Sequence, residues 1–361
     1  INTTVGDLEG NVARCLAAIQ KASRENPDMI VLPEMAVPGY PPRDILYDSS
    51  FTEAVSAATH DLAQRAKGGP PTLVGTLTSS GRNLPGHPGL YNIAVLIEDG
   101  EVQQVAAKRL LPGYDVFYEP RWFVSGPASV TTMIAGVRVG FLICEDMWDQ
   151  GYDIHPGAEL KAAGAELLVC ISATPYRRGV MEERLYHARR QGLPLVHVNL
   201  CGANDELIFD GHSFAVDKGG KLIAQLHAFE EDMQVVDLDK AAPISALDEN
   251  LEPELFSALT LGVRDFAKKN HLERAFLGLS GGIDSSVVAV IAAEALGPER
   301  VTAIAIPSRY TDPRSTECAQ TLADNLGIAL EAINLEGLHL SLIHISEPTR
   351  QLTQSRMPCS G

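Results

Sequence analysis

Three residues that border short apolar runs have the side chains needed to cleave a carbon–nitrogen bond. Glu34 occurs in the stretch LPEM, Lys108 in AKRLLP and Cys144 in ICEDMW. A thiol attacks an amide or nitrile carbon only as the thiolate, so it needs a base and a nearby cation. We expect Glu34 to accept the thiol proton, Lys108 to stabilise the thiolate and the developing oxyanion, and the backbone N–H of Glu145 to act as a second oxyanion donor. Each residue alone also fits a structural role, so the prediction depends on their combination.

A second stretch, LGLSGGIDSS at residues 277–286, combines adjacent glycines with flanking serines between a predicted strand and a predicted helix. Such a loop lets backbone N–H groups and hydroxyls surround an anion, with the helix N-terminus behind it. Its spacing fits neither GxxxxGK[ST] nor GxGxxG. The competing interpretation is an ordinary turn in which Asp284 or Ser285 caps the helix. The residues predicted to surround a phosphate are Gly278, Leu279, Ser280, Gly281, Gly282, Ile283, Asp284 and Ser285.

The elements that must position these groups alternate between strand and helix. The strands predicted at 28–33 and 137–144 end beside Glu34 and at Cys144, and strand ends are where α/β proteins place reactive groups. Further strands are predicted at 71–78, 91–98, 165–171 and 195–199, a hairpin at 213–225, and helices at 11–23, 51–66, 158–164 and 180–191. This pattern predicts a layered α/β sandwich with mixed sheets. A parallel unit follows, with helices at 253–269, 285–296 and 314–326 and strands at 275–279, 301–306 and 328–333.

Length and composition narrow the class of protein. A chain of 361 residues with a 45% hydrophobic fraction predicts two globular domains. The 46 acidic and 29 basic residues give a net charge of −17, which argues against binding to nucleic acid or to an anionic membrane. The sequence contains no run of 18 or more apolar residues and therefore predicts no membrane span. The six cysteines are scattered without a CxxC pair, which is typical of a reduced, cytoplasmic protein.

In their order along the chain, the motifs PEM, KRLLP and CEDMW resemble the Glu–Lys–Cys motifs of the nitrilase, or carbon–nitrogen hydrolase, superfamily. The resemblance covers about residues 1–240 and implies an αββα sandwich. It also implies that Glu34 is the general base, Lys108 the stabiliser of the intermediate and Cys144 the nucleophile. Glu119, in VFYE, matches the second glutamate that often accompanies them. Taken alone, Glu119 fits a surface carboxylate equally well.

The motif SGGxDS at residues 280–285 resembles the pyrophosphate loop of the ATP pyrophosphatase family. The resemblance implies a Rossmann-like parallel α/β domain of the adenine nucleotide alpha hydrolase type. Such enzymes split ATP into AMP and pyrophosphate and adenylate a carboxylate or carbonyl oxygen. ATP is therefore the expected substrate, and Asp284 is expected to help hold Mg²⁺.

An amidase ahead of an adenylating domain resembles the glutamine-dependent NAD⁺ synthetases, as do the stretches KRLLPGYDVFYE and DELIFDGHS. The implied enzyme is a ligase that takes ammonia from glutamine and converts deamido-NAD⁺ and ATP into NAD⁺, AMP and pyrophosphate. Glutamine contacts are implied for Tyr114, for Thr174 and for position 180. Val180 stands where the family pattern SPxxxGK/R has a cation, and Arg177 or Arg178 is an alternative source of that charge.

These resemblances predict a glutaminase domain over 1–240, a linker over 241–253 and an incomplete synthetase domain over 254–340. We expect a first strand before Asn2 to be missing and residues 341–361 to be a non-native tail. The chain as written is accordingly expected not to make NAD⁺, and its intact parent is expected to be a homo-oligomer acting on small molecules.

Two other functions stay open from the sequence. One is a stand-alone nitrilase-type amidase or carbamoylase with a nucleotide-binding appendage. The other is a non-catalytic assembly protein, because nitrilase-like domains commonly associate through their sheets and helices.

Overall fold

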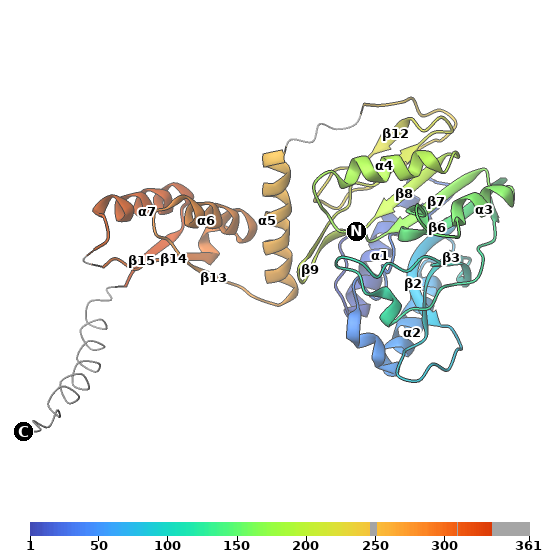
Figure 1. The fold of residues 1–361 in the computed structure, drawn as a ribbon, viewed down its shortest axis with the longest axis horizontal. Coiled ribbons are helices and arrows are strands. Elements are labelled where there is room, and N and C mark those ends of the chain that lie inside the picture. Colours follow the sequence, from blue (N-terminus) through green and yellow to red (C-terminus); the bar gives the residue numbers. More distant parts are fainter. Residues whose placement is uncertain (246–250, 309, 334–361) are drawn as a thin grey trace, which may run out of the picture. The chain divides into compact units, whose positions relative to one another are not determined.

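The computed structural model describes residues 1–245, 251–308 and 310–333. The chain divides into two compact units, Ile1–Gly262 and a second that begins at Val263, and each is described by itself (Figure 1). Helix α5 (Leu251–Lys269) crosses this division along the chain. The predicted tail at 341–361 lies outside the described residues, and the predicted domain boundaries stay predictions.

Two β-sheets form the centre of the first unit. The four-stranded sheet has the order β1-β2-β3-β4 and the six-stranded sheet the order β12-β11-β8-β7-β6-β5. Pairing is parallel for β1–β2, β6–β7 and β7–β8 and antiparallel for the other neighbours. The strands of the first sheet are Ile30–Val31, Thr72–Ser79, Leu90–Glu98 and Glu101–Ala107. Those of the second, β5 to β8 and then β11 and β12, are Thr132–Ile134, Val137–Ile143, Leu167–Ser172, Leu195–Asn199, Phe214–Val216 and Leu222–Gln225.

Side-chain alternation along the strands explains the layers of this unit. In β7, Leu167, Val169 and Ile171 belong to an apolar cluster shared with β2, β3 and β6, which packs the two sheets face to face. Leu168 and Cys170 point to the opposite face and pack with residues of α3 and α4. Because neighbouring strand residues alternate between faces, this continuous apolar run is buried on both sides. Helices α3 (Pro156–Ala162) and α4 (Val180–Arg190) therefore form an outer layer.

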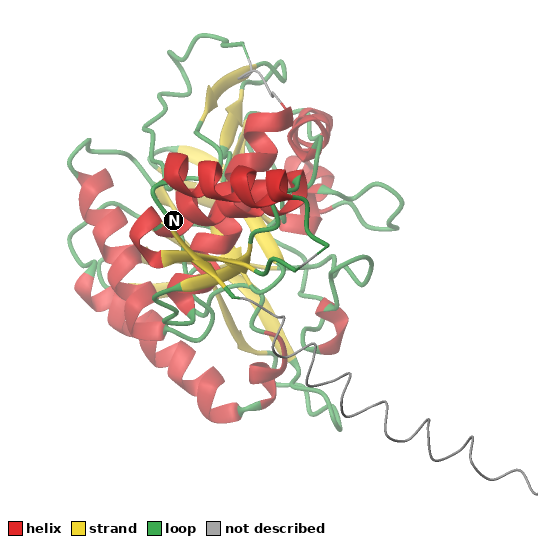
Figure 2. Cartoon of the chain, turned by 90° about the vertical axis from the view of Figure 1, so that its left-hand side faces the viewer, coloured by secondary structure: helices red, strands yellow, loops and turns green. Residues whose placement is uncertain are grey.

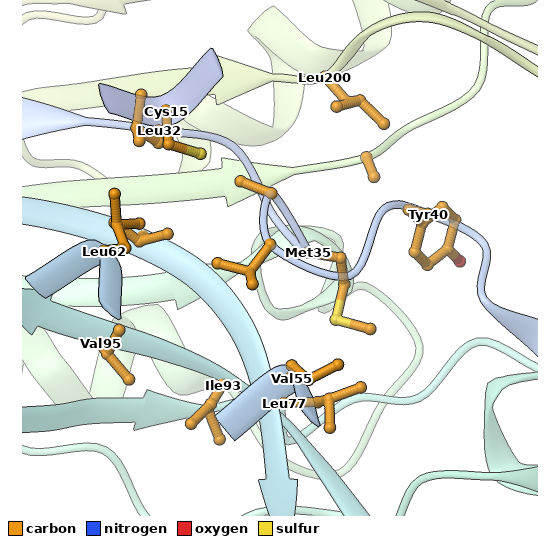
Figure 3. Close-up of a cluster of buried hydrophobic side chains, with 14 of the residues drawn as sticks. Cys15, Leu32, Met35, Tyr40, Val55, Leu62, Leu77, Ile93, Val95 and Leu200 are labelled. Carbon is orange, nitrogen blue, oxygen red and sulfur yellow. The ribbon is translucent and has the colours of Figure 1, made fainter. Parts of the chain in front are cut away.

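The other outer layer consists of α1 (Leu8–Ser23) and α2 (Ser49–Arg65), which cover the four-stranded sheet (Figure 2). Leu62 of α2 and Cys15 of α1 meet Ile93 and Val95 of β3 in the largest apolar cluster (Figure 3). Each helix begins with an aspartate cap, Asp7 or Asp48, that accepts a backbone N–H of the first turn. The predicted αββα sandwich is thus confirmed.

The second unit contains a parallel three-stranded sheet of order β13-β14-β15, and the predicted parallel α/β arrangement is confirmed. Its strands are Ala275–Gly278, Val301–Ala305 and Ala329–Ala332, and its helices α6 and α7 are Ile283–Leu296 and Pro313–Leu326. Gly327, with a φ of +71°, ends α7 in the left-handed region that glycine adopts without strain. Small residues such as Ala289, Ala319 and Ala323 let the two helices pack on the sheet.

The sequence prediction missed the hairpin formed by β9 (Cys201–Asn204) and β10 (Leu207–Asp210), and it also missed β5, which pairs antiparallel with β6. Asp205 and Glu206 form the turn between β9 and β10, and Asp205 has a φ of +51°. This hairpin contributes to the site described next. Among the described residues, no helix has the length and apolar character needed to cross a membrane.

Candidate active site

Glu34, Lys108 and Glu119 form a buried cluster of charges in the first unit. The Lys108 Nζ donates to Glu34 Oε1 at 3.0 Å and to Glu119 Oε1 at 2.8 Å. All three residues are at most 2% exposed. Burial opposes the ammonium charge, but Glu119 and Glu34 outweigh it and hold the pKa of Lys108 well above its usual value. Lys108 is therefore a fixed cation between two carboxylates.

The Glu34 carboxylate is held from several elements. Its Oε1 also accepts from the Asn92 side chain at 2.6 Å, and its Oε2 accepts from the backbone N–H of Ala173 at 2.7 Å. Tyr40 donates its hydroxyl to Glu119 Oε1 at 2.9 Å. The sequence prediction did not include Asn92 or Tyr40, because nothing in their local sequence connects them with residues 58 or 79 positions away.

Glycine at position 75 lets the segment that carries Glu34 pass directly over β2. A Cβ at Gly75 would lie 2.4 Å from Met35 N and 2.5 Å from both Glu34 Cα and Pro33 O. Real Cβ atoms do not approach backbone so closely, so the segment must move if any side chain is introduced. Gly75 therefore sets the height of Glu34 above the sheet.

For the amide hydrolysis predicted from the sequence, we expect Gly75→Ala to lower the rate by about 100-fold, because a displaced Glu34 loses its alignment with the Cys144 thiol. Overpacking should also cost about 1–3 kcal/mol of unfolding free energy. Steady-state kinetics and thermal unfolding measure the two effects. The matched control is Gly113→Ala, whose Cβ would meet only the Pro120 side chain at 3.6 Å. Equal activity of the two variants would contradict the prediction.

Cys144 lies at the end of β6, where the chain turns into a short 3-10 segment, Cys144–Met147. Its φ of +47° is uncommon for a residue with a side chain, and such backbone outliers cluster at functional sites. The Sγ atom lies 3.6 Å from Thr174 Oγ1. Burial, reinforced by the negative charge of Glu34, raises the pKa of the Cys144 thiol well above its usual value. Cys144 therefore rests as a thiol and needs a base.

Asp146 joins the Lys108 segment to the Cys144 turn. Its Oδ1 accepts from the backbone N–H groups of Arg109 and Leu110, both at 2.9 Å, and its Oδ2 accepts from Ile143 N at 3.2 Å. Burial raises the pKa of Asp146 to about 6 against the opposing effect of these donors. This carboxylate was not predicted as functional, although it follows Cys144 by two residues.

A pocket of about 590 Å³ opens beside Cys144. The three predicted glutamine-contact positions, Tyr114, Thr174 and Val180, all line it, so the structure brings them together with the nucleophile candidate. Arg177 also lines the pocket and pairs with Glu183, whereas Arg178 does not. Of the two arginines considered from the sequence, Arg177 is thus the one in a position to contact a ligand.

Glu145 gives this pocket an anionic wall that the sequence prediction overlooked. Its carboxylate accepts from the Tyr114 hydroxyl at 3.0 Å and from the Tyr152 hydroxyl at 2.8 Å. Burial raises the pKa of Glu145, and the hydroxyl donors oppose that shift. A carboxylate oriented by two phenols is suited to bind a substrate ammonium group.

The predicted phosphate loop of the second unit lies between β13 and α6, at the carboxyl ends of parallel strands. Ser285 Oγ accepts from Ser280 N at 3.2 Å, and Ser280 Oγ accepts from Gly282 N at 3.3 Å. Gly281 has a φ of +80°, and a Cβ there would lie 2.1 Å from Ser315 O. This position therefore requires glycine, and the loop is folded tightly at the start of α6, as anion-binding loops are.

Asp284 lies in the first turn of α6. Within the described ranges, no three His, Cys, Asp or Glu side chains gather as a metal site. A single carboxylate still fits Mg²⁺, because this ion is commonly held by one or two carboxylates together with substrate phosphates and water.

Comparison with known proteins agrees with this geometry. The sequence profile of the carbon–nitrogen hydrolase family matches residues 1–244, and that of NAD synthase matches residues 255–356. The chain therefore belongs to the carbon–nitrogen hydrolase family.

Among curated proteins, the chain is similar to the glutamine-dependent NAD(+) synthetase of Synechocystis sp., with 39% identity over 92% of this chain and 63% of that protein. The protein of the same description from Thermotoga maritima is 35% identical over 91% of this chain and 63% of its own length. The chain thus spans less than two thirds of these relatives.

Among solved structures, the glutamine-dependent NAD+ synthetase of Acinetobacter baumannii in complex with ADP matches with a TM-score of 0.87 and 27% identity, over 100% of this chain and 67% of that one. An amidase from Nesterenkonia sp. matches with a TM-score of 0.51 and 24% identity, over 63% of this chain and 84% of that one. The second match concerns the fold alone.

Proposed function

We propose that the first unit hydrolyses the side-chain amide of glutamine to glutamate and ammonia, with Cys144 as nucleophile. The observation that carries the proposal is the buried Glu34–Lys108–Glu119 cluster behind a cysteine that opens into a pocket. A buried cation between two carboxylates is costly to desolvate, and it is difficult to explain as a contribution to stability alone. It supplies a base and an electrostatic stabiliser in a dry site.

In the proposed reaction, Glu34 accepts the Cys144 proton while the sulfur attacks the amide carbon. Lys108 Nζ and the Glu145 backbone N–H stabilise the resulting oxyanion. When the C–N bond breaks, protonated Glu34 returns the proton to the leaving nitrogen, which departs as ammonia. Water then attacks the thioester with Glu34 again as base, and glutamate leaves with the thiol restored.

Glutamine is the favoured substrate because the pocket offers charges for both ends of an amino acid. Glu145 suits an α-ammonium group and Arg177 an α-carboxylate, while Tyr114 and Thr174 provide hydroxyls. The test compares glutamine with glutaramic acid, 4-aminobutyramide, other ω-amides and carbamoyl amino acids. Preference for glutamine by at least about tenfold in kcat/KM is expected, because an analogue that lacks the ammonium or the carboxylate loses a charge-assisted hydrogen bond to the pocket. A preference for carbamoyl substrates would favour the carbamoylase alternative, and no hydrolysis of any of them would favour an assembly role.

The pH dependence of this activity follows from Glu119. Burial raises the pKa of Glu119 to about 7, above its ordinary 4.5, although Lys108 opposes the shift. Glu119 is therefore a carboxylate above pH 7 and gains a proton below it, which removes one of the two carboxylates that position the Lys108 ammonium. We expect kcat/KM to fall toward about tenfold per pH unit below pH 7. In Glu119→Gln the decrease of kcat/KM below pH 7 should become smaller. The same pH profile in this variant as in the parent would contradict the role given to Glu119.

The second unit supports a proposal for the reaction that consumes the ammonia. We propose that the whole protein is a glutamine-hydrolysing ligase that converts deamido-NAD⁺ and ATP into NAD⁺, AMP and pyrophosphate, as the names of its relatives suggest. The loop from Gly278 to Ser285 would hold the ATP phosphates, and Asp284 would ligate the Mg²⁺ that neutralises them. Ammonia delivered away from bulk water stays unprotonated and nucleophilic. Isothermal titration calorimetry of ATP binding to the parent chain and to Gly281→Val, with and without Mg²⁺, tests this part of the proposal.

We further propose a cytoplasmic location, since the thiol of Cys144 has to stay reduced, and a homo-oligomeric state for the intact protein. Fractionation and light scattering test these two proposals.

A further inference from the structure

A buried polar network lies beside the proposed catalytic groups without touching the pocket. Arg184 of α4 is 0% exposed and donates through Nη1 and Nη2 to the two oxygens of Asp210 at 2.7 and 2.8 Å. The same Nη2 donates to the backbone oxygen of Thr174 at 3.0 Å. Asn199 Nδ2 donates to Asp210 Oδ1 at 3.2 Å. Both ions are thus buried and bonded to each other.

This network holds both backbone groups of Thr174. Asn199 Oδ1 accepts from Thr174 N at 2.9 Å, and Asn199 Nδ2 donates to Thr174 O at 3.3 Å. Strand β7 has already ended at Ser172, so side chains supply the hydrogen bonds that a strand would otherwise supply. The position of residue 174 is therefore set by Arg184 and Asn199.

The segment 173–174 in turn touches both reacting groups. The Ala173 N–H donates to Glu34 Oε2 at 2.7 Å, and Thr174 Oγ1 lies 3.6 Å from Cys144 Sγ. A shift of this segment would move the base and the hydroxyl next to the nucleophile together. The network also joins α4 to β10, both of which carry residues that line the pocket, such as Val180 and Leu207.

We infer that Arg184, Asp210 and Asn199 are positioning residues for the thiol reaction, acting through the segment 173–174 rather than on substrate. The inference rests on the proposed amide hydrolysis. A purely structural ion pair can be replaced by apolar residues of similar volume without loss of stability. A positioning pair can be replaced in this way at similar stability but not without loss of activity, because the Thr174 carbonyl would then lose its charged donor.

The test uses the full chain and the double variant Arg184→Met/Asp210→Leu. Its matched control makes the same replacements, Arg65→Met/Asp61→Leu, in the exposed ion pair of α2. The readouts are the Tm, kcat and KM for glutamine, and the rate at which iodoacetamide alkylates Cys144, followed by mass spectrometry. We expect a Tm within about 5 °C of the parent but kcat and alkylation rate lowered about 10–100-fold, with KM changed less than about threefold.

Arg184→Lys retains the charge and one donor, so it should recover part of the lost rate if positioning is the cause. Asn199→Ser removes the contacts of Asn199 to Thr174 but leaves the Arg184–Asp210 ion pair. It should also slow alkylation, and it provides the test in case the double variant does not fold. A folded double variant or Asn199→Ser with parental kcat and alkylation rate would overturn the inference. If the parent hydrolyses no amide, the proposed function fails, while alkylation still tests the positioning.

Discussion

Replacing Cys144, the proposed nucleophile, with alanine should abolish the proposed amide hydrolysis, with a loss of at least about 10⁴-fold in kcat, because the variant lacks the thiol that would form the thioester. The Cys144 thiol is 3% exposed and rests in its protonated form, so its replacement removes no buried charge. The loss of activity should therefore occur without global unfolding. Glutamate release from glutamine, measured beside the Tm of the same preparation, separates the two effects. Cys144→Ser retains the shape but is a poorer nucleophile, and it should be nearly as inactive.

The matched control is Cys15→Ala. Cys15 is also fully buried in the first unit, but it packs among apolar side chains of α1 and β3 rather than at the pocket. Truncation there should cost about 1 kcal/mol of stability and leave kcat unchanged. Hydrolysis that survives Cys144→Ala, or disappears in Cys15→Ala at equal folded fraction, would show that the nucleophile has been misidentified.

Replacing Lys108 with methionine should have the largest effect on stability. The variant leaves Glu34 and Glu119 facing each other in a dry interior without their cation, and breaking such a buried arrangement costs about 3–5 kcal/mol. For a unit of this size we expect the Tm to fall by about 10 °C. Activity should vanish as well, since the oxyanion loses its charged donor.

The loss of unfolding free energy caused by Lys108→Met should depend on pH, and the direction of this dependence can be worked out. Without the ammonium, Glu119 loses the charge that opposes its raised pKa, so it holds a proton even more readily in the folded chain than in the unfolded chain. The folded state then binds more protons, so the stability of the variant falls as the pH rises. The deficit should therefore be smaller at pH 5 than at pH 8. Lys221→Met, at an exposed lysine, is the control, and an equal deficit at both pH values would contradict the account.

The sequence could mark Glu34, Lys108 and Cys144 as candidates because each lies in a short motif beside a strand end, and the structure brings Glu34 and Lys108 together. Glu34 and Cys144 directly follow apolar runs that become β1 and β6. The positions predicted from the resemblance to contact glutamine, Tyr114, Thr174 and Val180, share one pocket. Local patterns and motif order thus hold most of the information about chemistry.

The supporting residues could not be predicted, because their roles arise from contacts between distant segments. Asn92 of β3 reaches Glu34 across β2, and Arg184 meets Asp210 only because the unpredicted hairpin β9–β10 returns beside α4. Neither residue lies in a pattern that periodicity or spacing would mark. Asp146 is the exception, since its place two residues after Cys144 could have drawn attention to it.

The contact between Glu34 and Ala173 spans 139 positions of the chain. A ribosome-bound chain that has emerged only as far as the first sheet would hold Glu34, the proposed base, and Lys108 but not Cys144, the proposed nucleophile. Cys144 acquires its proposed base only when the second sheet docks. During refolding, hydrolysis should consequently return later than the circular dichroism signal of the secondary structure. The recovery of activity would then measure the docking of the two sheets.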